Sequence, residues 1–300
     1  MGTILAVANR KGGVGKSTVA TMVAHAFSVW GEMRVLLIDV DAQANASLIL
    51  IGGENWVKAR KRNATLADYI YDFFPLKPVE PASYILPEAS DLRAQDGGVP
   101  PLTLMPGSLE IEDREHEIMV RLASQGTPFH QVEEAVTTRF RTLLRHAGDG
   151  YDLVILDCPP GISFSTRASI AVADIVLVPF RPDYVSLFAV DRIGRMIEEC
   201  YPPRQLKDIP MDQRRYVTLA NMYRETSIHD RLVDEMAAFH PIMETRIPQT
   251  AAIANAFDWE ANRRTIRQKY KSALPHVETL YSELLPLVER RRSSGEETSA

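Results

Sequence analysis

The sequence predicts an α/β protein whose sheet is doubly wound and mainly parallel. The first observation is a set of short apolar runs that are continuous instead of alternating, as strands covered on both faces are. The second is that helical patterns lie between most of these runs. The third is a glycine-rich segment between the first run and a helical pattern at 19–29. The apolar runs span residues 4–8, 35–38, 102–105, 153–156, 175–178 and 217–220.

Length and composition are those of an ordinary globular protein. The chain has 300 residues, of which 45% are hydrophobic and 24% charged. We expect one domain over residues 1–292, interrupted at about 52–101 by a loop-rich surface insertion with a helix at 64–74. Residues 293–300 are expected to form a disordered tail.

Charge and cysteine usage narrow the function classes. The net charge of −5 disfavours a uniformly basic nucleic-acid coat, so any DNA binding must come from a local patch. Cys158 and Cys200 show no CxxC spacing, which disfavours a disulfide scaffold or a zinc site, and Cys158 is expected to be a small packed residue. With no apolar run of about 18 residues and no signal pattern, we expect a soluble cytoplasmic protein.

The segment after the first strand carries the strongest chemical signal. It reads Arg10-Lys11-Gly12-Gly13-Val14-Gly15-Lys16-Ser17-Thr18. A glycine-rich turn between a strand and a helix points backbone N–H groups and the helix N-terminus at one spot, where polyphosphate can bind. Lys16 is expected to reach the β- and γ-phosphates and Ser17 to ligate Mg²⁺. A plain glycine turn would not need lysine, hydroxyl and helix in this order.

This nucleotide-binding loop is a variant. Arg10 stands where a glycine normally opens the phosphate loop of P-loop NTPases, and Lys11 is an additional lysine. The fold class is therefore refined to a P-loop NTPase with a Rossmann-like sheet. The expected nucleotide contacts run from Lys11 to Thr18: Lys11, Gly12, Gly13, Val14, Gly15, Lys16, Ser17 and Thr18.

Three aspartates follow two of the buried strands. Asp39 and Asp41 come at the end of the second apolar run, and Asp157 closes the fourth. Ligands of open α/β sheets bind at the carboxyl ends of the strands, so these side chains should face the phosphate loop. There they can order water around Mg²⁺ or orient an attacking water. Turn formation is the alternative for Asp39 and Asp41.

Cationic residues near the C-terminus are spaced for a helix. Arg263, Arg267 and Lys271 are four residues apart, and no acidic residue lies between 263 and 271. On a helix they would form one stripe able to neutralise phosphates of duplex DNA. A solvated helix face is the alternative, since no base-reading pattern accompanies the charges. The helical pattern at 277–287 should pack on the sheet, with a membrane-surface helix as the weaker interpretation.

Together these residues resemble the ParA/MinD family of P-loop ATPases with a deviant Walker A motif. The resemblance runs through most of residues 3–272 in family order. It rests on KGGVGKST, IDVDAQANAS, LTLMPGSLEIED, YDLVILDCPP, DIVLVPFRPDYVSLFAV, NMYRETS and ETRIPQTAAIANA.

The resemblance implies roles for individual residues. Lys11 would be the signature lysine that reaches across a dimer interface to the partner's nucleotide. Asp41 would position the hydrolytic water, while Asp39 and Asp157 would hold the magnesium shell. Asn221 and Pro248 match positions that line the adenine pocket, which makes ATP the expected nucleotide.

Three departures from the family pattern stand out. Ala42 stands where the family usually has proline, which should only loosen that turn. Gln249 replaces an arginine linked to DNA binding in ParA relatives, which weakens the expectation of DNA binding. The chain begins at the first strand, so we expect no N-terminal helix-turn-helix domain and no operator binding.

At the level of function, the resemblance implies a cytoplasmic, nucleoid-associated ATPase that forms a homodimer in the ATP state. It would bind DNA without sequence preference and position a plasmid, chromosome origin or protein cluster. A ParB-like or cargo-bound partner would stimulate hydrolysis. The alternative is a MinD-like switch that binds membrane and recruits a division or polar regulator. A relative of the nitrogenase iron protein ranks last, because two isolated cysteines supply no cluster ligands.

Overall fold

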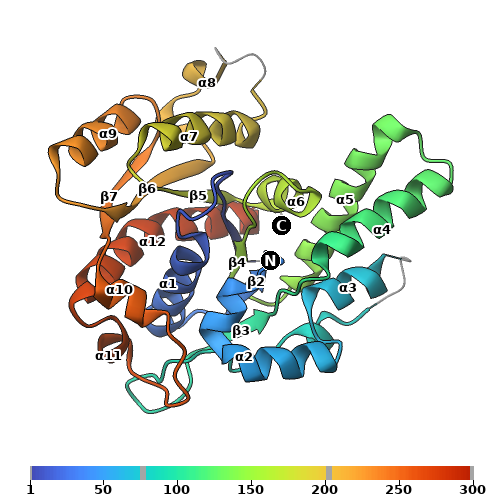
Figure 1. Ribbon diagram of the computed structural model, residues 1–300, viewed down its shortest axis with the longest axis horizontal. Coiled ribbons are helices and arrows are strands. Elements are labelled where there is room, and N and C mark those ends of the chain that lie inside the picture. Colours follow the sequence, from blue (N-terminus) through green and yellow to red (C-terminus); the bar gives the residue numbers. More distant parts are fainter. Residues whose placement is uncertain (1, 75–78, 201–204, 298–300) are drawn as a thin grey trace.

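A single parallel sheet organises the protein (Figure 1). The computed structural model describes residues 2–74, 79–200 and 205–297. Neighbouring strands all pair in parallel, in the order β3-β2-β4-β1-β5-β6-β7. This confirms the predicted α/β fold with a doubly wound sheet. The strands are β1 (Thr3–Val7), β2 (Val35–Asp39), β3 (Leu102–Met105), β4 (Leu153–Asp157), β5 (Ile175–Phe180), β6 (Tyr216–Tyr223) and β7 (Ile242–Pro248).

Helices cover both faces of the sheet, as the continuous apolar strands require. In β1, Leu5 and Val7 join one buried cluster, while Ile4 and Ala6 join the cluster on the opposite face. The first cluster is closed by α1 (Lys16–Val29), α2 (Asn45–Lys61), α10 (Ala251–Ala256), α11 (Ile266–Tyr270) and α12 (Leu274–Glu297). The second is closed by α3 (Leu66–Phe73), α4 (Ile111–Ser124), α5 (Phe129–Ala147), α6 (Phe164–Val172), α7 (Tyr184–Ile197), α8 (Gln205–Asp208) and α9 (Ser227–Ala237).

Strand β7 was absent from the predicted set. It lies at the edge of the sheet, and its burial alternates: Met243, Thr245 and Ile247 are buried, whereas Glu244 is exposed. A search for continuous apolar runs cannot detect such a strand, because only one of its faces is covered. The Glu283 carboxylate of α12 accepts hydrogen bonds from the N–H groups of Glu244 and Thr245, each at 2.8 Å, so part of this edge is already paired.

The insertion is more helical than expected. The predicted helix at 64–74 is present as α3, which begins with a capping box between Thr65 and Asp68. The expectation of loop from residue 52 is wrong, because α2 continues to Lys61. Gly52 adopts φ 72° and ψ 164°, which are not helical values, so α2 consists of two helical segments that meet at a kink there. Between α3 and β3 lie a short 3₁₀ turn, η1 (Pro81–Tyr84), and irregular segments.

The kink in α2 gives a matched pair of test substitutions. A Cβ atom on Gly52 would lie 2.5 Å from the Trp259 ring, whereas nothing lies within 4 Å of one on Gly53. Gly52→Ala should lower the free energy of unfolding by about 2–4 kcal/mol, through backbone strain and displacement of Trp259. Gly53→Ala should leave it unchanged or raise it by up to about 1 kcal/mol. Urea denaturation measures both, and equal effects would contradict the kink.

The C-terminal helix packs on the sheet, as expected. The side chains of Val277, Leu280, Leu284 and Val288 are fully buried against it. The helix α12 extends through Glu297, so the predicted disordered tail does not begin at 293, and residues 298–300 lie outside the described residues. A helix of membrane-spanning length and apolarity does not occur within residues 2–74, 79–200 and 205–297.

Candidate nucleotide-binding site

Two glycines shape the loop between β1 and α1. Gly13 and Gly15 adopt φ values of 70° and 82°, which side-chain-bearing residues rarely occupy. A Cβ atom on Gly15 would lie 2.3 Å from Asn221 Nδ2. The Asn221 amide donates to the Val14 carbonyl at 2.7 Å and so fixes the loop to β6 from behind. The loop conformation therefore depends on glycine at both positions and on Asn221.

A cavity of about 360 Å³ opens in front of this loop. It lies at the N-terminus of α1, where unpaired backbone N–H groups and the helix dipole favour an anion. The structure thus brings together Lys16, Ser17 and Asp41, as the sequence predicts. The lining residues are Gly12, Gly13, Gly15, Lys16, Ser17, Thr18, Asp41, Gln43, Asn45, Ile49 and Pro160.

Lys16 is held inside the cavity wall. Its ammonium donates to the Lys11 carbonyl at 3.3 Å, and its side chain is mostly buried. Burial lowers the pKa of Lys16, and the nearby carboxylate of Asp157 opposes that shift. A buried ammonium group in this position favours an anionic ligand, because the ligand's negative charge would stabilise the cation in place of the water that burial removes.

Asp39 and Asp157 form a buried pair of acids. They are direct neighbours in the register of β2 and β4, and both are fully buried. Burial raises the pKa of Asp39 to about 7. Burial and the adjacent Asp39 carboxylate also raise the pKa of Asp157 well above its usual value. Two carboxyl groups this close favour a cation or a shared proton between them.

The two acids differ in their hydrogen bonds. Asp39 accepts from the Ser47 N–H at 2.8 Å, from the Ser47 hydroxyl at 2.6 Å and from the Asp41 N–H at 3.3 Å, so it holds the start of α2. Both carboxylate oxygens of Asp157 are buried, and neither accepts a hydrogen bond of ordinary geometry in the described part of the chain, although the Ser17 hydroxyl lies near enough to oppose the rise in the pKa of Asp157. Asp157 is therefore the better placed of the two for a metal ion.

These residues fit a magnesium ion that is shared with a nucleotide. Within the described ranges, no cluster of three His, Cys, Asp or Glu side chains forms a metal site made by protein alone. Magnesium in phosphate-transfer sites is commonly held by one or two carboxylates together with substrate phosphates and water. The unpaired carboxylate of Asp157 beside the phosphate loop meets that requirement.

Asp41 lies at the wall of the cavity. Its Oδ1 accepts the Gln43 N–H at 2.9 Å, which fixes the carboxylate, and its side chain is mostly buried. The sequence pattern alone left turn formation open for this residue. The structure places it both in a turn and on the cavity, where it can face an attacking water.

Lys11 does not line its own cavity. Its ammonium lies 2.6 Å from Asp183 Oδ2 and 3.3 Å from the Ser186 hydroxyl, at the N-terminus of α7, and the side chain is 29% exposed. Although burial favours the protonated acid, hydrogen bonds from Lys11 and Ser186 keep the pKa of Asp183 below its usual value. Asp183 is recognisable in the sequence as a helix N-cap, but no sequence signal connects it with Lys11.

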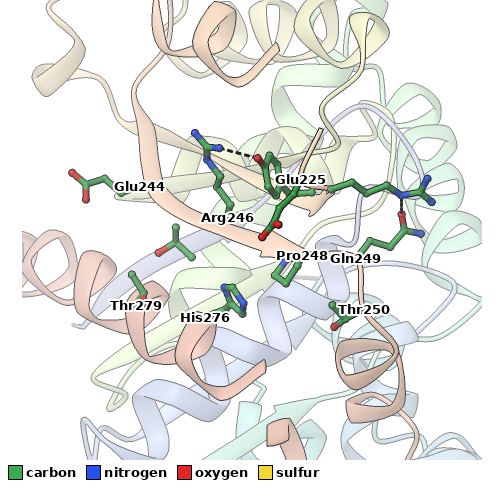
Figure 2. Close-up of a pocket in the computed structure, with 11 residues that line it drawn as sticks. Glu225, Glu244, Arg246, Pro248, Gln249, Thr250, His276 and Thr279 are labelled. Carbon is green, nitrogen blue, oxygen red and sulfur yellow. Dashed lines mark hydrogen bonds between the residues drawn. The ribbon is translucent and has the colours of Figure 1, made fainter. Parts of the chain in front are cut away.

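Pro248 and Asn221 occupy different places. Pro248 lines a second cavity, of about 780 Å³, between the ends of β6 and β7 and the start of α12 (Figure 2). Gln249, labelled in Figure 2, also lines this cavity, and its Oε1 accepts a hydrogen bond from Arg224 Nε at 2.9 Å. Asn221 lines neither cavity, because its side chain supports the phosphate loop.

The predicted cationic stripe at 263–271 is wrong as a helical surface. Thr265 caps α11, which has only the five residues Ile266–Tyr270, and Lys271 ends it with φ 48°. Arg263 lies before this helix. Lys269 is 1% exposed and pairs with Asp91. Arg267 and Lys271 remain exposed, but they share no continuous helix with Arg263.

The two cysteines are packed residues of the core. Cys158 and Cys200 are both free and buried. Burial raises the pKa of Cys158 to about 12, so its thiol stays protonated at neutral pH. This agrees with the expectation of a small packed residue beside the phosphate loop.

A glycine loop after the first strand, a lysine and a serine at the start of α1, and buried aspartates at neighbouring strand ends define a P-loop nucleoside triphosphatase. Residues 2–207 match the family model described as an AAA domain. The chain belongs to this family and is a P-loop ATPase of the ParA/MinD type. The predicted resemblance is confirmed.

The individual relatives that match this chain have low sequence identity to it. The chain is 30% identical over 195 residues to the chromosome partitioning protein ParA of Caulobacter vibrioides, a match that covers 65% of this chain and 62% of the relative. Two solved structures share the fold, each over 95% of this chain. Cobyrinic acid a,c-diamide synthase of Mycobacterium smegmatis, with bound ATP analog and magnesium, has a TM-score of 0.66 at 21% identity over 94% of its length. A variant of McdA from Cyanothece, in complex with ATP, has a TM-score of 0.66 at 18% identity over 96% of its length.

Proposed function

We propose that this protein is an ATPase switch that dimerises around ATP, binds nucleoid DNA without sequence preference and positions a cargo. A ParB-like or cargo-bound partner would stimulate hydrolysis and release the protein from DNA. The observation that carries the proposal is the cavity at the N-terminus of α1. It gathers Lys16, Ser17 and Asp41 beside the unpaired carboxylate of Asp157.

The cavity residues can divide the work of ATP hydrolysis. Lys16 and the backbone N–H groups of the loop would bind the β- and γ-phosphates. Ser17 and Asp157 would hold Mg²⁺, and Asp39 would keep Ser47 and the start of α2 in place. When bound, magnesium offsets the negative charge of the phosphates. Asp41 would orient the water whose oxygen attacks the γ-phosphorus, which gives ADP and phosphate.

The adenine base would lie toward the second cavity, against Pro248. Asn221 would then act indirectly, since it fixes the loop that binds the phosphates. Two solved structures of this fold support ATP as the nucleotide: one holds an ATP analog with magnesium, and the other is a complex with ATP.

The position of Lys11 supports the proposal that this residue acts at a dimer interface. The phosphate cavity already has Lys16, and the Lys11 ammonium points instead to Asp183 at the N-terminus of α7. A lysine on this surface can reach phosphates bound by a second copy once it leaves Asp183. The dimer would therefore have each Lys11 at the partner's nucleotide.

DNA is the proposed matrix, and the sequence pattern indicates Arg263, Arg267 and Lys271 as the residues that would bind its phosphates. The ParA relative supports this choice by its name, chromosome partitioning protein. The membrane alternative has less support, because the apolar residues Val277, Leu280, Leu284 and Val288 of α12 are buried against the sheet.

The proposal predicts that DNA binding depends on the nucleotide. Anisotropy of a labelled random-sequence duplex should rise with protein in the presence of a non-hydrolysable ATP analogue and Mg²⁺, and only weakly with ADP or without nucleotide. Shuffled duplexes should bind equally well. Equal binding in all nucleotide states would contradict the switch, and binding to anionic vesicles instead of DNA would favour the MinD-like alternative.

A further inference from the structure

The inserted segment offers a binding residue that the sequence did not single out. We infer that residues 86–93 and 263–271 form one unit, here called the basic module, and that Arg93 binds duplex DNA phosphates together with Arg267 and Lys271. The inference rests on the proposed DNA binding. It assigns a role to the inserted segment and changes which residues make the contacts.

Backbone hydrogen bonds join the two parts of the module. Leu92 and Arg264 form a parallel β-bridge, and the Arg93 N–H donates to the Arg264 carbonyl at 2.9 Å. The Arg263 guanidinium donates to the carbonyls of Glu88 and Ser90, each at 3.0 Å. In Figure 1 the inserted segment accordingly passes beside α11. Arg263 thus works inside the module, as a clamp on the inserted segment.

A buried ionic cluster fixes the module to α1, the helix that begins at the phosphate loop. Asp91 Oδ1 lies 2.9 Å from His25 Nε2 of α1, and Asp91 Oδ2 pairs with the Lys269 ammonium of α11. His25 Nδ1 lies 2.9 Å from the Tyr270 hydroxyl. All four side chains are buried. Moving the segment away would separate these partners and leave an unpaired charge in the interior, which is strongly destabilising. The cluster therefore holds the segment in one position.

The remaining cations of the module face solvent. Arg264 forms an ion pair with Glu260, and Lys269 forms one with Asp91. Arg93, Arg267 and Lys271 are exposed and have no ion-pair partner among the residues that the structure describes. Of the five cations at 263–271, two are therefore free of partners among the described residues, and Arg93, whose N–H is bonded to Arg264, adds a third exposed cation to the module.

Duplex DNA fits this surface better than a lipid surface does. Leu92, Ile266 and Tyr270 of the module are buried, and Leu86 is partly buried against the same core, so these apolar residues are not free to insert between lipid chains. The three free cations are attached to a backbone that hydrogen bonds hold in place. Cations on a fixed backbone suit the phosphates of a duplex, because these are regularly spaced. They can recognise charge but carry no base-reading pattern, which agrees with binding independent of sequence.

The test is DNA binding by Arg93→Ala in the full chain, with the ATP analogue and a random duplex of about 40 base pairs, several times the span of the module's contacts. The substitution keeps the Arg93 N–H and should leave folding intact. One lost phosphate contact lowers the salt slope by about 0.9 and the affinity by roughly 5- to 10-fold at about 0.1 M salt. Arg93→Lys should retain most of the slope. Arg145→Ala, an exposed arginine on α5 across the sheet, is the matched control and should change nothing.

The outcomes separate this inference from the proposed function. Unchanged affinity and salt slope in Arg93→Ala, alongside a loss in Arg267→Ala, would overturn the role of Arg93 and leave DNA binding standing. Absence of DNA binding by the wild-type chain in every nucleotide state would overturn both. If Arg93→Ala weakens binding to phosphatidylglycerol vesicles but not to the duplex, the surface is a lipid surface and the inference is wrong.

Discussion

Lys16→Ala should abolish ATP binding, whereas Asp41→Ala should bind ATP normally and fail to hydrolyse it. Lys16 is a mostly buried cation at the phosphate cavity, so its loss removes ground-state attraction and should raise the Kd for ATP at least about 100-fold. Asp41 lies on the cavity wall, where it can act on the attacking water. Its loss should lower kcat by about 100- to 1,000-fold with little change in Kd.

Titration with a fluorescent ATP analogue and a phosphate-release assay measure the two effects separately. Lys58→Ala is a suitable control, because Lys58 is exposed on α2 and does not line the cavity. If the two cavity variants lost affinity equally, Asp41 would be a binding residue and its assignment to the attacking water would be wrong.

Sequence patterns predict this fold well because their signals are local. A strand buried on both faces reads as a continuous apolar run, and β1 to β6 are found in this way. The phosphate loop is equally local, since its lysine, serine and glycines are consecutive. Strand β7 is not predicted in this way, because only one of its faces is covered and its apolar residues alternate with exposed ones.

The parts that could not be predicted depend on contacts between distant segments. Asp39 and Asp157 look alike in the sequence, yet Ser47 satisfies one and leaves the other unpaired. The partner of Lys11 is Asp183, far along the chain. Spacing of four also suggested a helix at 263–271, but Thr265 and Lys271 confine α11 to five residues between them.

Lys11→Ala should bind ATP as a monomer and fail to dimerise or hydrolyse. In the free protein its ammonium pairs with Asp183 and does not line the phosphate cavity, so its loss should leave the cavity intact. Two nucleotides at a shared interface bring their phosphate chains close together. A lysine donated from each side would offset that repulsion where water is scarce. Light scattering with ATP measures the dimer.

A mixture of two inactive variants separates the contributions of the two subunits. When Lys11→Ala pairs with Asp41→Ala, the first subunit keeps its own Asp41 and still receives Lys11 from its partner. That site should turn over at up to the wild-type rate per site, while the second site has neither group. Each parent alone should stay inactive, so activity that appears only on mixing requires Lys11 to act across the interface. Full ATP-dependent dimerisation of Lys11→Ala alone would instead mean that Lys11 serves its own subunit through Asp183, and that the chain is an ordinary P-loop switch.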